Sequence, residues 1–278
     1  MLTSVIIPAY NEENYIGKCL ESLGKQSFKD FEIIIIDDGS TDKTREIIRK
    51  YKKIILIIGE HKGTAFSRNL GAKKAKGEIL IFVDADMTFN KDYLKNLVKP
   101  ILENEKIIGA THENEIAMNT DNIWSRLWGK VRVDKESVKD VKIFRVIRKS
   151  KFLEMGGFDS KYGYADDQTF WFKFKLKPVV AENTICYHNN PETLKETFKQ
   201  AIWIGASWKE RFKIFRISGI NYFALRMLWI GLPFFVFAKS LKGVEGVGFR
   251  NKLRFFWCKF YGYFIGIEKA VLSGEVWK

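Results

Sequence analysis

Short runs of apolar, mostly β-branched residues alternate with helix-patterned segments along the first 105 residues. The apolar runs cover residues 5–7, 32–36, 54–58 and 79–83, and the helical segments between them cover residues 13–23, 43–51 and 65–75. A strand that is apolar throughout is buried on both faces, which is typical of a parallel sheet with helices on either side. The pattern therefore predicts an α/β fold, with binding residues beyond the carboxyl ends of these strands.

The alternation becomes less regular in the second half of the chain. A helix over residues 91–102 leads to predicted strands over residues 107–116 and 141–147, separated by a polar and aromatic stretch. A further helix is predicted over residues 167–174, and short strands continue as far as residue 188. Pro191 predicts the start of a helix that runs to about residue 211, because proline is favoured in the first turn of a helix.

The C-terminal residues 203–278 combine basic, apolar and aromatic side chains. They hold 13 Lys and Arg against 4 Asp and Glu, in a chain whose formal net charge is +14. Two apolar stretches lie within them, over residues 217–238 and 255–272. The first is about long enough to cross a bilayer, but it contains Asn221, Arg226 and Pro233, and an arginine at mid-depth costs roughly 2.5–3.5 kcal/mol. We expect amphipathic helices that lie on an anionic membrane surface. A helical cap packed on the rest of the protein is the alternative.

Length and composition fit a folded protein in a reducing compartment. A chain of 278 residues with 46% hydrophobic content can bury one large core. Its cysteines, Cys19, Cys186 and Cys258, lie far apart in the sequence, which predicts neither a disulfide framework nor a zinc site. The first eight residues lack a basic region followed by a long apolar stretch, so we expect a strand there rather than a signal peptide.

Two aspartates follow the fourth apolar run without a gap. Because side chains alternate along an extended chain, Asp84 and Asp86 of the sequence Asp-Ala-Asp point to the same side. Paired carboxylates at the end of a buried strand can hold a hard cation together with phosphate oxygens. Such a cation would offset the charge of a departing diphosphate. A turn that caps the next helix is the alternative, and the strand-to-helix context disfavours it.

Two more loops follow the second and the first apolar runs. Asp37 and Asp38 open the sequence Asp-Asp-Gly-Ser-Thr-Asp, in which a carboxylate can accept an N–H group of a nucleobase while the glycine lets the chain turn. A simple capped turn is the alternative, but a cap needs one aspartate and two adjacent ones repel each other. In Pro-Ala-Tyr-Asn-Glu-Glu, Tyr10 can stack on a base and Glu12 can face a ribose. The three loops together would form three sides of a nucleotide pocket.

These three loops, together with Gly63 to Asn69, resemble the family 2 glycosyltransferases, which have the GT-A fold. The four motifs occur in order, and the likeness covers about the first 190 residues. It implies an inverting transferase that uses a nucleoside diphosphate sugar, commonly of uridine or guanosine, with Mg²⁺ or Mn²⁺. The resemblance assigns Pro8, Tyr10 and Glu12 to the nucleoside, Asp38 to the base, Asp84 and Asp86 to the ribose, pyrophosphate and metal, and Arg68 and His61 to the donor site. His61 stands where the family commonly has asparagine, and Ser67 where it has alanine.

Asp166 and Asp167, in the sequence Tyr-Ala-Asp-Asp, are the candidates for the catalytic base. Inverting transfer needs a carboxylate that removes the proton of the acceptor hydroxyl as this group attacks the anomeric carbon. We choose Asp167. The family usually has Glu-Asp here, and Asp166 takes the place of the glutamate, so the division of roles between the two stays open. A helix N-terminus enriched in acidic residues is the alternative.

Four other positions are candidates for substrate or metal contacts. Gly157 and Phe158, in Gly-Gly-Phe-Asp, resemble the acceptor loop of the family, and Tyr164 can stack on an acceptor sugar. His188 is a candidate third metal or diphosphate contact, although a lone histidine is more often structural. The Gln-x-x-Arg-Trp motif of processive synthases is missing, since Gln200 is followed by Ala-Ile-Trp. We therefore expect the transfer of one sugar followed by release.

The expected organisation has three parts. Residues 1–105 would bind the nucleotide-sugar, residues 106–212 the acceptor, and residues 213–278 would form the membrane-associated helical tail. The predicted function is a non-processive, inverting glycosyltransferase at the cytoplasmic face of the membrane, acting on a lipid-linked or glycan acceptor. A soluble cytoplasmic enzyme is the alternative location, and a polyprenyl-phosphate glycosyl donor synthase is the second candidate function.

Three further functions are disfavoured. Sugar nucleotidyltransfer needs a glycine-rich loop after the first strand, and the segment from Pro8 to Glu13 contains no glycine. A nucleic-acid-binding module would line a groove with its basic excess, whereas here that excess gathers in an apolar tail. We therefore expect no nucleic-acid partner. A sugar-binding protein without catalytic activity is the third alternative.

Overall fold

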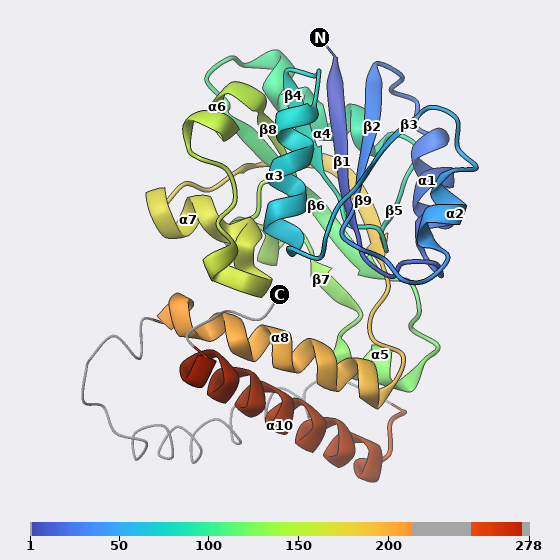
Figure 1. Cartoon of the computed structure of the whole chain (residues 1–278), viewed down its shortest axis with the longest axis vertical. Coiled ribbons are helices and arrows are strands. Elements are labelled where there is room, and N and C mark those ends of the chain that lie inside the picture. The colour runs from blue at the N-terminus through green and yellow to red at the C-terminus, as the bar shows by residue number, and fades with distance from the viewer. Residues whose placement is uncertain (1, 213–245, 274–278) are drawn as a thin grey trace.

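The structure, a computed structural model, describes residues 2–212 and 246–273. A mixed sheet of nine strands forms the centre of this described part (Figure 1). The strands are β1 (Thr3–Ala9), β2 (Phe31–Asp37), β3 (Ile54–Ile58), β4 (Ile79–Phe82), β5 (Thr88–Phe89), β6 (Gly109–Ala117), β7 (Val131–Val133), β8 (Val146–Arg148) and β9 (Val179–His188). Their order is β3-β2-β1-β4-β8-β6-β9-β5, with β7 paired to β6. The first four strands of this order are parallel, and β6 is parallel to β9. The expected α/β fold with a mostly parallel sheet is confirmed.

Helices cover both faces of the sheet. They are α1 (Ile16–Gly24), α2 (Thr44–Ile48), α3 (Thr64–Lys74), α4 (Tyr93–Glu103), α5 (Ile123–Trp128), α6 (Lys149–Glu154), α7 (Thr169–Phe174), α8 (Leu194–Phe212) and α10 (Phe249–Ser273), with 3₁₀ helices η1 (Ser137–Asp140) and η2 (Ser160–Gln168). Side chains alternate along β1, so Val5 and Ile7 pack in the core under α1 and α4, while Ile6 packs in the core under α3, α6 and α7. The strands are apolar throughout because both of their faces are buried.

Helix α3 lies unusually close to the sheet. A Cβ atom at Gly71 would lie 2.5 Å from Cγ2 of Ile6 in β1, so only glycine allows this approach. Arg68 lies about one turn earlier on the same helix and is buried. The close packing of α3 therefore brings a buried arginine to the end of the central strands.

Three predicted elements begin later or are shorter than expected. The strand predicted over residues 141–147 is formed only as β8, Val146–Arg148, which pairs with Ile79 to Ile81 of β4, and the ladder ends where the N–H group of Phe82 donates to the carbonyl of Arg145. The helix predicted from residue 167 begins at Thr169 as α7, because Asp167 and Gln168 belong to the preceding 3₁₀ helix η2. The helix predicted from Pro191 begins at Leu194, where Oγ1 of Thr193 accepts the N–H group of Glu196.

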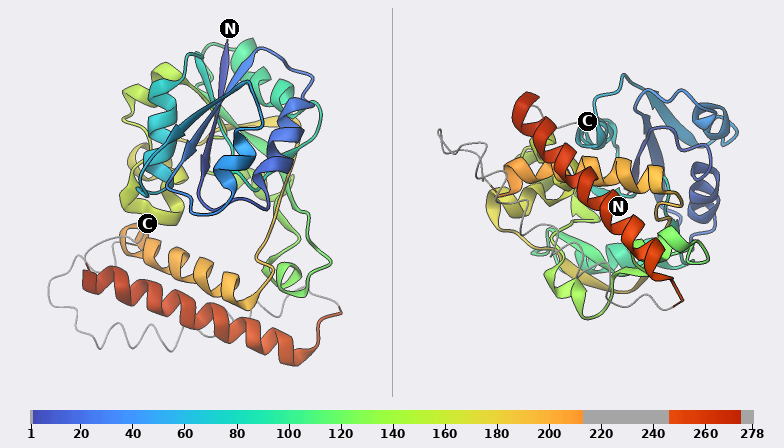
Figure 2. Two further views of the ribbon diagram at one scale, coloured as in Figure 1. Left: turned by 45° about the vertical axis from the view of Figure 1, so that its right-hand side comes forward. Right: turned by 90° about the horizontal axis from the view of Figure 1, so that it is seen from below.

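Helices α8 and α10 pack side by side beyond the carboxyl ends of the parallel strands (Figures 1 and 2). A Cβ atom at Gly205 of α8 would lie 2.3 Å from the carbonyl oxygen of Tyr263, and one at Gly266 of α10 would lie 2.1 Å from that of Ile202. The two helix backbones therefore touch where glycines face them. Among the described residues, none of the helices is sufficiently long and apolar to cross a bilayer. The apolar stretch 217–238 lies outside the described residues.

Candidate active site

The loops that follow β1, β2 and β4 lie next to each other, because these three strands are neighbours and parallel. The N–H group of Asn11 donates to Oγ of Ser40 at 2.9 Å, and that of Glu12 donates to Oγ1 of Thr44 at 2.7 Å. The side chain of Asn11 accepts in turn from the N–H group of Thr41 at 2.8 Å. The first and second predicted binding loops are thus joined into one rim.

Three residues predicted for the donor site, Tyr10, Asp38 and His61, lie together beside this rim. The ring of Tyr10 stacks on that of His61 with 4.0 Å between centroids. Nδ1 of His61 lies 3.0 Å from the carboxylate of Asp38, whose two oxygens accept the N–H groups of Lys62 and Gly63 at 2.9 Å each. Asp38 therefore holds the loop before α3 and contacts the ring of His61. Tyr10 is 42% exposed, so its free ring face is open to a ligand.

Asp37 has a separate structural role. Its carboxylate is buried and forms an ion pair with Nε of Arg45 in α2. One of its oxygens also accepts the N–H group of Ser40 at 3.3 Å. The two adjacent carboxylates therefore have different partners: that of Asp37 pairs with Arg45 in α2, and that of Asp38 accepts N–H groups of the loop before α3.

A row of buried ion pairs crosses the end of β4. Arg68 donates to Asp84 and to Asp166 at 2.6 Å each, and Arg145 donates to the second oxygen of Asp84 at 3.1 Å. Burial opposes ionisation of Asp84, but the two guanidinium groups outweigh it and lower its pKa to about 2. Asp84 is thus ionised and held by two arginines. Arg68 was predicted from its motif, whereas Arg145 lies in no recognisable motif and was not predicted.

Two carboxylates of the site, those of Glu12 and Asp86, have no cationic partner among the ion pairs of the described residues. Burial and the neighbouring charges of Asp86 and Asp84 raise the pKa of Glu12 to about 8. Burial and the charge of Asp84 likewise raise the pKa of Asp86 to about 7, although Arg132 opposes the shift. Two half-buried oxygen ligands that repel each other can hold a divalent cation such as Mg²⁺ or Mn²⁺.

Asp166 and Asp167 lie at the end of η2 and have different surroundings. Asp166 is buried on Arg68, and the hydroxyl of Thr169 donates to its backbone carbonyl at 2.6 Å. The carboxylate of Asp167 is half-buried and makes no ion pair with the described residues. Burial raises the pKa of both groups, and the proximity of Asp84 adds to the shift. Of the two, Asp167 has the carboxylate that is free to accept a proton.

The residues predicted to contact the acceptor have mixed environments. Phe158 is buried between Phe82 and Phe152, and its backbone N–H and C=O groups bond to the side chain of Asn69 at 2.9 and 2.8 Å. Gly157, with φ of 68°, makes this turn beside α3. The half-buried ring of Tyr164 meets Trp203 of α8 edge-on at 5.0 Å. The backbone of this loop and the ring of Tyr164 therefore border the site, whereas the side chain of Phe158 belongs to the core.

His188 contacts Asn190 and Glu115. Its Nε2 lies 2.9 Å from Oδ1 of Asn190, and its Nδ1 lies 3.3 Å from Glu115, close enough for an ion pair but not aligned for a hydrogen bond. Burial lowers the pKa of His188 to about 4, so its ring is neutral near pH 7. Among the described residues, no hydrogen bond or ion pair joins His188 to Asp84 or Asp86.

Glu115 is the centre of a buried network that sequence reasoning missed. It lies 3.1 Å from His112, 3.3 Å from Arg132 and 3.6 Å from Arg145. Burial opposes its ionisation, but the hydrogen bond with His112 and the two guanidinium groups lower its pKa well below the usual range. No local pattern indicated this residue, because the strand β6 that carries it is polar over His112 to Glu115.

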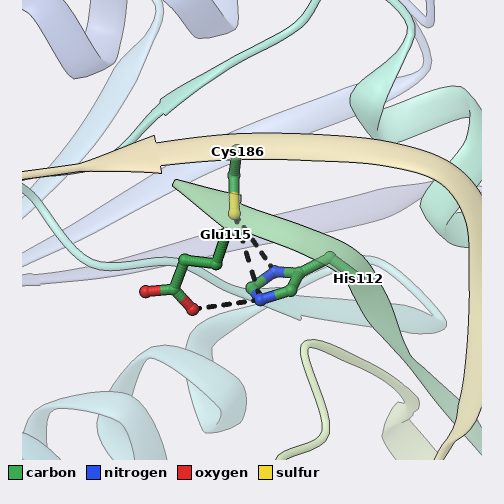
Figure 3. A group of neighbouring side chains, drawn as sticks. All are labelled: His112, Glu115 and Cys186. Atoms are coloured by element: carbon green, nitrogen blue, oxygen red, sulfur yellow. Dashed lines mark hydrogen bonds and ion pairs between the residues drawn. The ribbon is translucent and has the colours of Figure 1, made fainter. Parts of the chain in front are cut away.

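His112, Glu115 and Cys186 form a compact buried group (Figure 3). Sγ of Cys186 lies 3.3 Å from Nδ1 of His112, and the hydroxyl of Tyr93 lies 3.1 Å from the same nitrogen. Burial raises the pKa of the Cys186 thiol well above its usual range. Two arginines next to Glu115 oppose a cation. The geometry therefore favours a hydrogen-bonded chain that anchors Glu115 over a metal centre.

Comparison with known proteins identifies the family. A model of glycosyl transferase family 2 matches residues 4–163. The glycosyltransferase GlyA of Streptococcus pneumoniae serotype 4 is 39% identical over 104 residues, which is 36% of this chain and 15% of that protein. TarS of Staphylococcus aureus Mu50, a poly(ribitol-phosphate) beta-N-acetylglucosaminyltransferase, is 42% identical over 103 residues, 34% of this chain and 18% of TarS. The aligned region is thus a small part of these two relatives.

Solved structures confirm the expected GT-A fold. S. aureus TarS 1–349 has a TM-score of 0.56 at 21% identity, covering 100% of this chain and 93% of that one. The mannosyltransferase PcManGT of Pyrobaculum calidifontis, in complex with GDP-Man and Mn²⁺, has a TM-score of 0.61 at 19% identity, covering 98% and 87%. The family model spans more than half of the 278 residues and includes the rim built by Glu12, Asp38 and Asp84. The chain belongs to glycosyl transferase family 2.

Proposed function

We propose that the protein transfers one sugar at a time, with inversion, from a nucleoside diphosphate sugar to a hydroxyl group of a cell-envelope glycan or lipid-linked acceptor. The observation that carries this proposal is the convergence of Glu12, Asp38, Asp84, Asp86 and Asp167 at one edge of the sheet. The donor class is supported by solved relatives that hold UDP-GlcNAc or GDP-Man. TarS is a poly(ribitol-phosphate) transferase, and TuaG of Bacillus subtilis a putative teichuronic acid biosynthesis glycosyltransferase. Both names favour an envelope glycan as acceptor.

The donor would lie along the rim. The open face of Tyr10 would stack on the base, with Asp38 and His61 beside it, and Pro8 ends the strand that carries this loop. Glu12 and Asp86 fit a divalent cation, because they are the carboxylates of the site without a cationic partner among the described residues. When bound, Mg²⁺ or Mn²⁺ would supply charge that stabilises the diphosphate. Asp84, already held by Arg68 and Arg145, would orient the donor rather than compete for the metal.

Asp167 would act as the general base. The oxygen of the acceptor hydroxyl attacks the anomeric carbon, its proton passes to the carboxylate of Asp167, and the bond between the sugar and the diphosphate breaks with its electron pair on the diphosphate oxygen. Arg68 holds Asp166 next to Asp167 and so fixes the end of η2. The raised pKa of Asp167 suits a group that must accept a proton near neutral pH.

Nucleotide binding with and without metal tests this proposal. We expect UDP or GDP to raise the melting temperature in the presence of Mn²⁺ and to raise it less in its absence, because a ligand that binds only the folded state stabilises it. Asp86→Ala should remove most of the difference made by Mn²⁺, whereas Asp121→Ala, an exposed residue, should leave it unchanged. If neither nucleotide changes the melting temperature with Mn²⁺ present, the proposed donor class is wrong.

The same measurement should depend on pH. The folded-state pKa values of Glu12, about 8, and Asp86, about 7, lie above the usual 4.5 and 3.8, so the folded protein binds more protons than the unfolded chain between pH 7 and 8. Stability without metal should therefore fall as the pH rises through this window. The stabilisation by Mn²⁺ should grow over the same window, since the ion no longer has to displace those protons. Equal Mn²⁺ effects at pH 6.5 and pH 8 would contradict the assignment of these two carboxylates.

We also propose that α10 rests on an anionic membrane surface. Arg250, Arg254, Trp257 and Tyr261 follow helical spacing along its exposed side, with Trp257 42% and Tyr261 48% exposed. Arginine and interfacial aromatic side chains on one helix face suit a charged lipid surface. The protein should float with vesicles of phosphatidylglycerol and phosphatidylcholine, and Trp257→Ser with Tyr261→Ser should reduce this. Equal recovery with pure phosphatidylcholine vesicles, or no flotation, would contradict the proposal.

A further inference from the structure

Four polar side chains form a closed ring of contacts near the ends of β6 and β9: Arg132, Glu115, His188 and Asn190. Arg132 of β7 lies 3.3 Å from Oε1 of Glu115 and 3.5 Å from Oδ1 of Asn190. The same two oxygens lie 3.3 and 2.9 Å from the two ring nitrogens of His188. Oε1 of Glu115 and Oδ1 of Asn190 therefore each lie close to both Arg132 and His188. Nε2 of His188 is bonded to Asn190, and its Nδ1 is buried beside Glu115.

Of the four residues in this ring, Arg132 is the one that reaches the solvent. Its side chain is 32% exposed, compared with 5% for Glu115 and 1% for His188. Glu115 shares its negative charge among Arg132, Arg145 and His112, so it does not cancel the charge of Arg132 alone. His188 is neutral near pH 7. Among the four residues of this ring, the positive charge that a ligand can reach therefore belongs to Arg132.

The position of β7 brings this charge to the metal-binding carboxylates. Val131 of β7 pairs with Ile116 near the end of β6, and Ala117 pairs with His188 at the end of β9. These ends lie at the same edge of the sheet as the end of β4, and β7 lies on the side of α8 (Figure 1). Directly after β9, the amide of Asn189 donates to the backbone carbonyl of Asp86 at 3.3 Å.

We propose that Arg132 forms a phosphate-binding subsite that holds the diphosphate of the donor opposite Glu12 and Asp86. This inference rests on the proposed nucleotide-sugar function and adds a residue to it. A guanidinium group fixed by Glu115 and Asn190 keeps further N–H groups for phosphate oxygens, and charge-assisted bonds of this kind are strong. When the bond between sugar and diphosphate breaks, one more negative charge develops on the diphosphate oxygen. Arg132 would stabilise that charge.

Arg132 could instead serve only to tie β7 to Glu115. Binding measurements can distinguish this structural role from phosphate binding, because the two roles predict different effects of substitution. We would measure the dissociation constants of radiolabelled UDP, uridine, GDP and guanosine by equilibrium dialysis with Mn²⁺ present. Arg132→Gln should weaken diphosphate binding roughly 10- to 100-fold and leave nucleoside binding within about twofold. Lys135→Gln removes the same charge from an 80% exposed side chain nearby and should change neither.

Each other outcome would overturn the inference. Unchanged diphosphate binding by Arg132→Gln would make Arg132 structural, and equal weakening of nucleoside and diphosphate would mean that the whole pocket is disturbed. If Arg132→Gln does not fold, Arg132→Lys keeps the charge but loses the fork of donors, and it should still weaken the diphosphate selectively. If the wild-type protein binds neither UDP nor GDP, the proposed function itself is wrong. If the wild type binds a nucleoside diphosphate and Arg132→Gln binds it equally well, only the inference about Arg132 is wrong.

Discussion

Asp167→Asn should lower the turnover number by about 10³-fold, within the range of 10² to 10⁴ that a positioned general base contributes. The amide has almost the same size as the carboxylate but cannot accept the proton of the acceptor hydroxyl. Because Asp167 makes no ion pair with the described residues, its replacement leaves no charge without a partner. Donor affinity should stay within about twofold and the melting temperature should not fall. Initial rates at saturating donor, with dialysis of the donor nucleotide, would measure both effects.

Asp166→Asn is the informative comparison for this prediction. Asp166 forms a 2.6 Å ion pair with the buried Arg68, so its replacement should lower stability as well as activity. Activity of Asp167→Asn near that of the wild type would reject Asp167 as the base. Complete loss of activity in Asp166→Asn with an unchanged melting temperature would assign the base to Asp166 instead.

Arg68→Met should destabilise the fold by roughly 3–5 kcal/mol, the usual result of removing one partner from buried ion pairs. The change leaves Asp166 buried without a cation and removes one of the two arginines that hold Asp84. Methionine fills much of the same volume, so the loss would come from the uncompensated charges. Urea denaturation at pH 7.5 would measure the free energy of unfolding.

Two comparisons make the effect of Arg68→Met specific. Arg49→Met removes an arginine from the exposed end of α2 and should change stability by less than about 0.5 kcal/mol. Adding Asp166→Asn to Arg68→Met should recover part of the loss, since one of the buried charges is then neutral. The destabilisation should also shrink toward pH 5, where the carboxylates left without a partner take up protons. A loss that is independent of pH would point to packing rather than charge.

The donor side of the site could be predicted from the sequence because its residues lie in short segments at the ends of strands. Asp38 and Asp84 follow β2 and β4, and Tyr10 and Glu12 follow β1, so the order of a parallel sheet is enough to place them on one edge. The family motifs lie in the same segments. For this part of the molecule, local pattern and tertiary position agree.

The ion pairs around the site could not be predicted from the sequence in the same way. Arg132, Arg145 and Glu115 belong to no motif, and the predicted strands that contain Glu115 and Arg145 gave no indication of which residues they contact. Their contacts join residues distant in sequence, such as Arg145 with Asp84. Aromatic residues in the second half of the chain also gave ambiguous signals, since Phe158 packs in the core whereas Tyr164 borders the site.

The sequence by itself determined the α/β fold, the parallel strands and the edge at which a nucleotide would bind, because each follows from local hydrophobic period and from the alternation of side chains along a strand. Tertiary structure alone decided which charges are neutralised. It placed Arg68 and Arg145 on Asp84, gave Glu12 and Asp86 no ion pair with the described residues, and bonded Nε2 of His188 to Asn190. Ion pairing depends on distances of a few ångströms between segments far apart in the chain, and no local pattern encodes such distances.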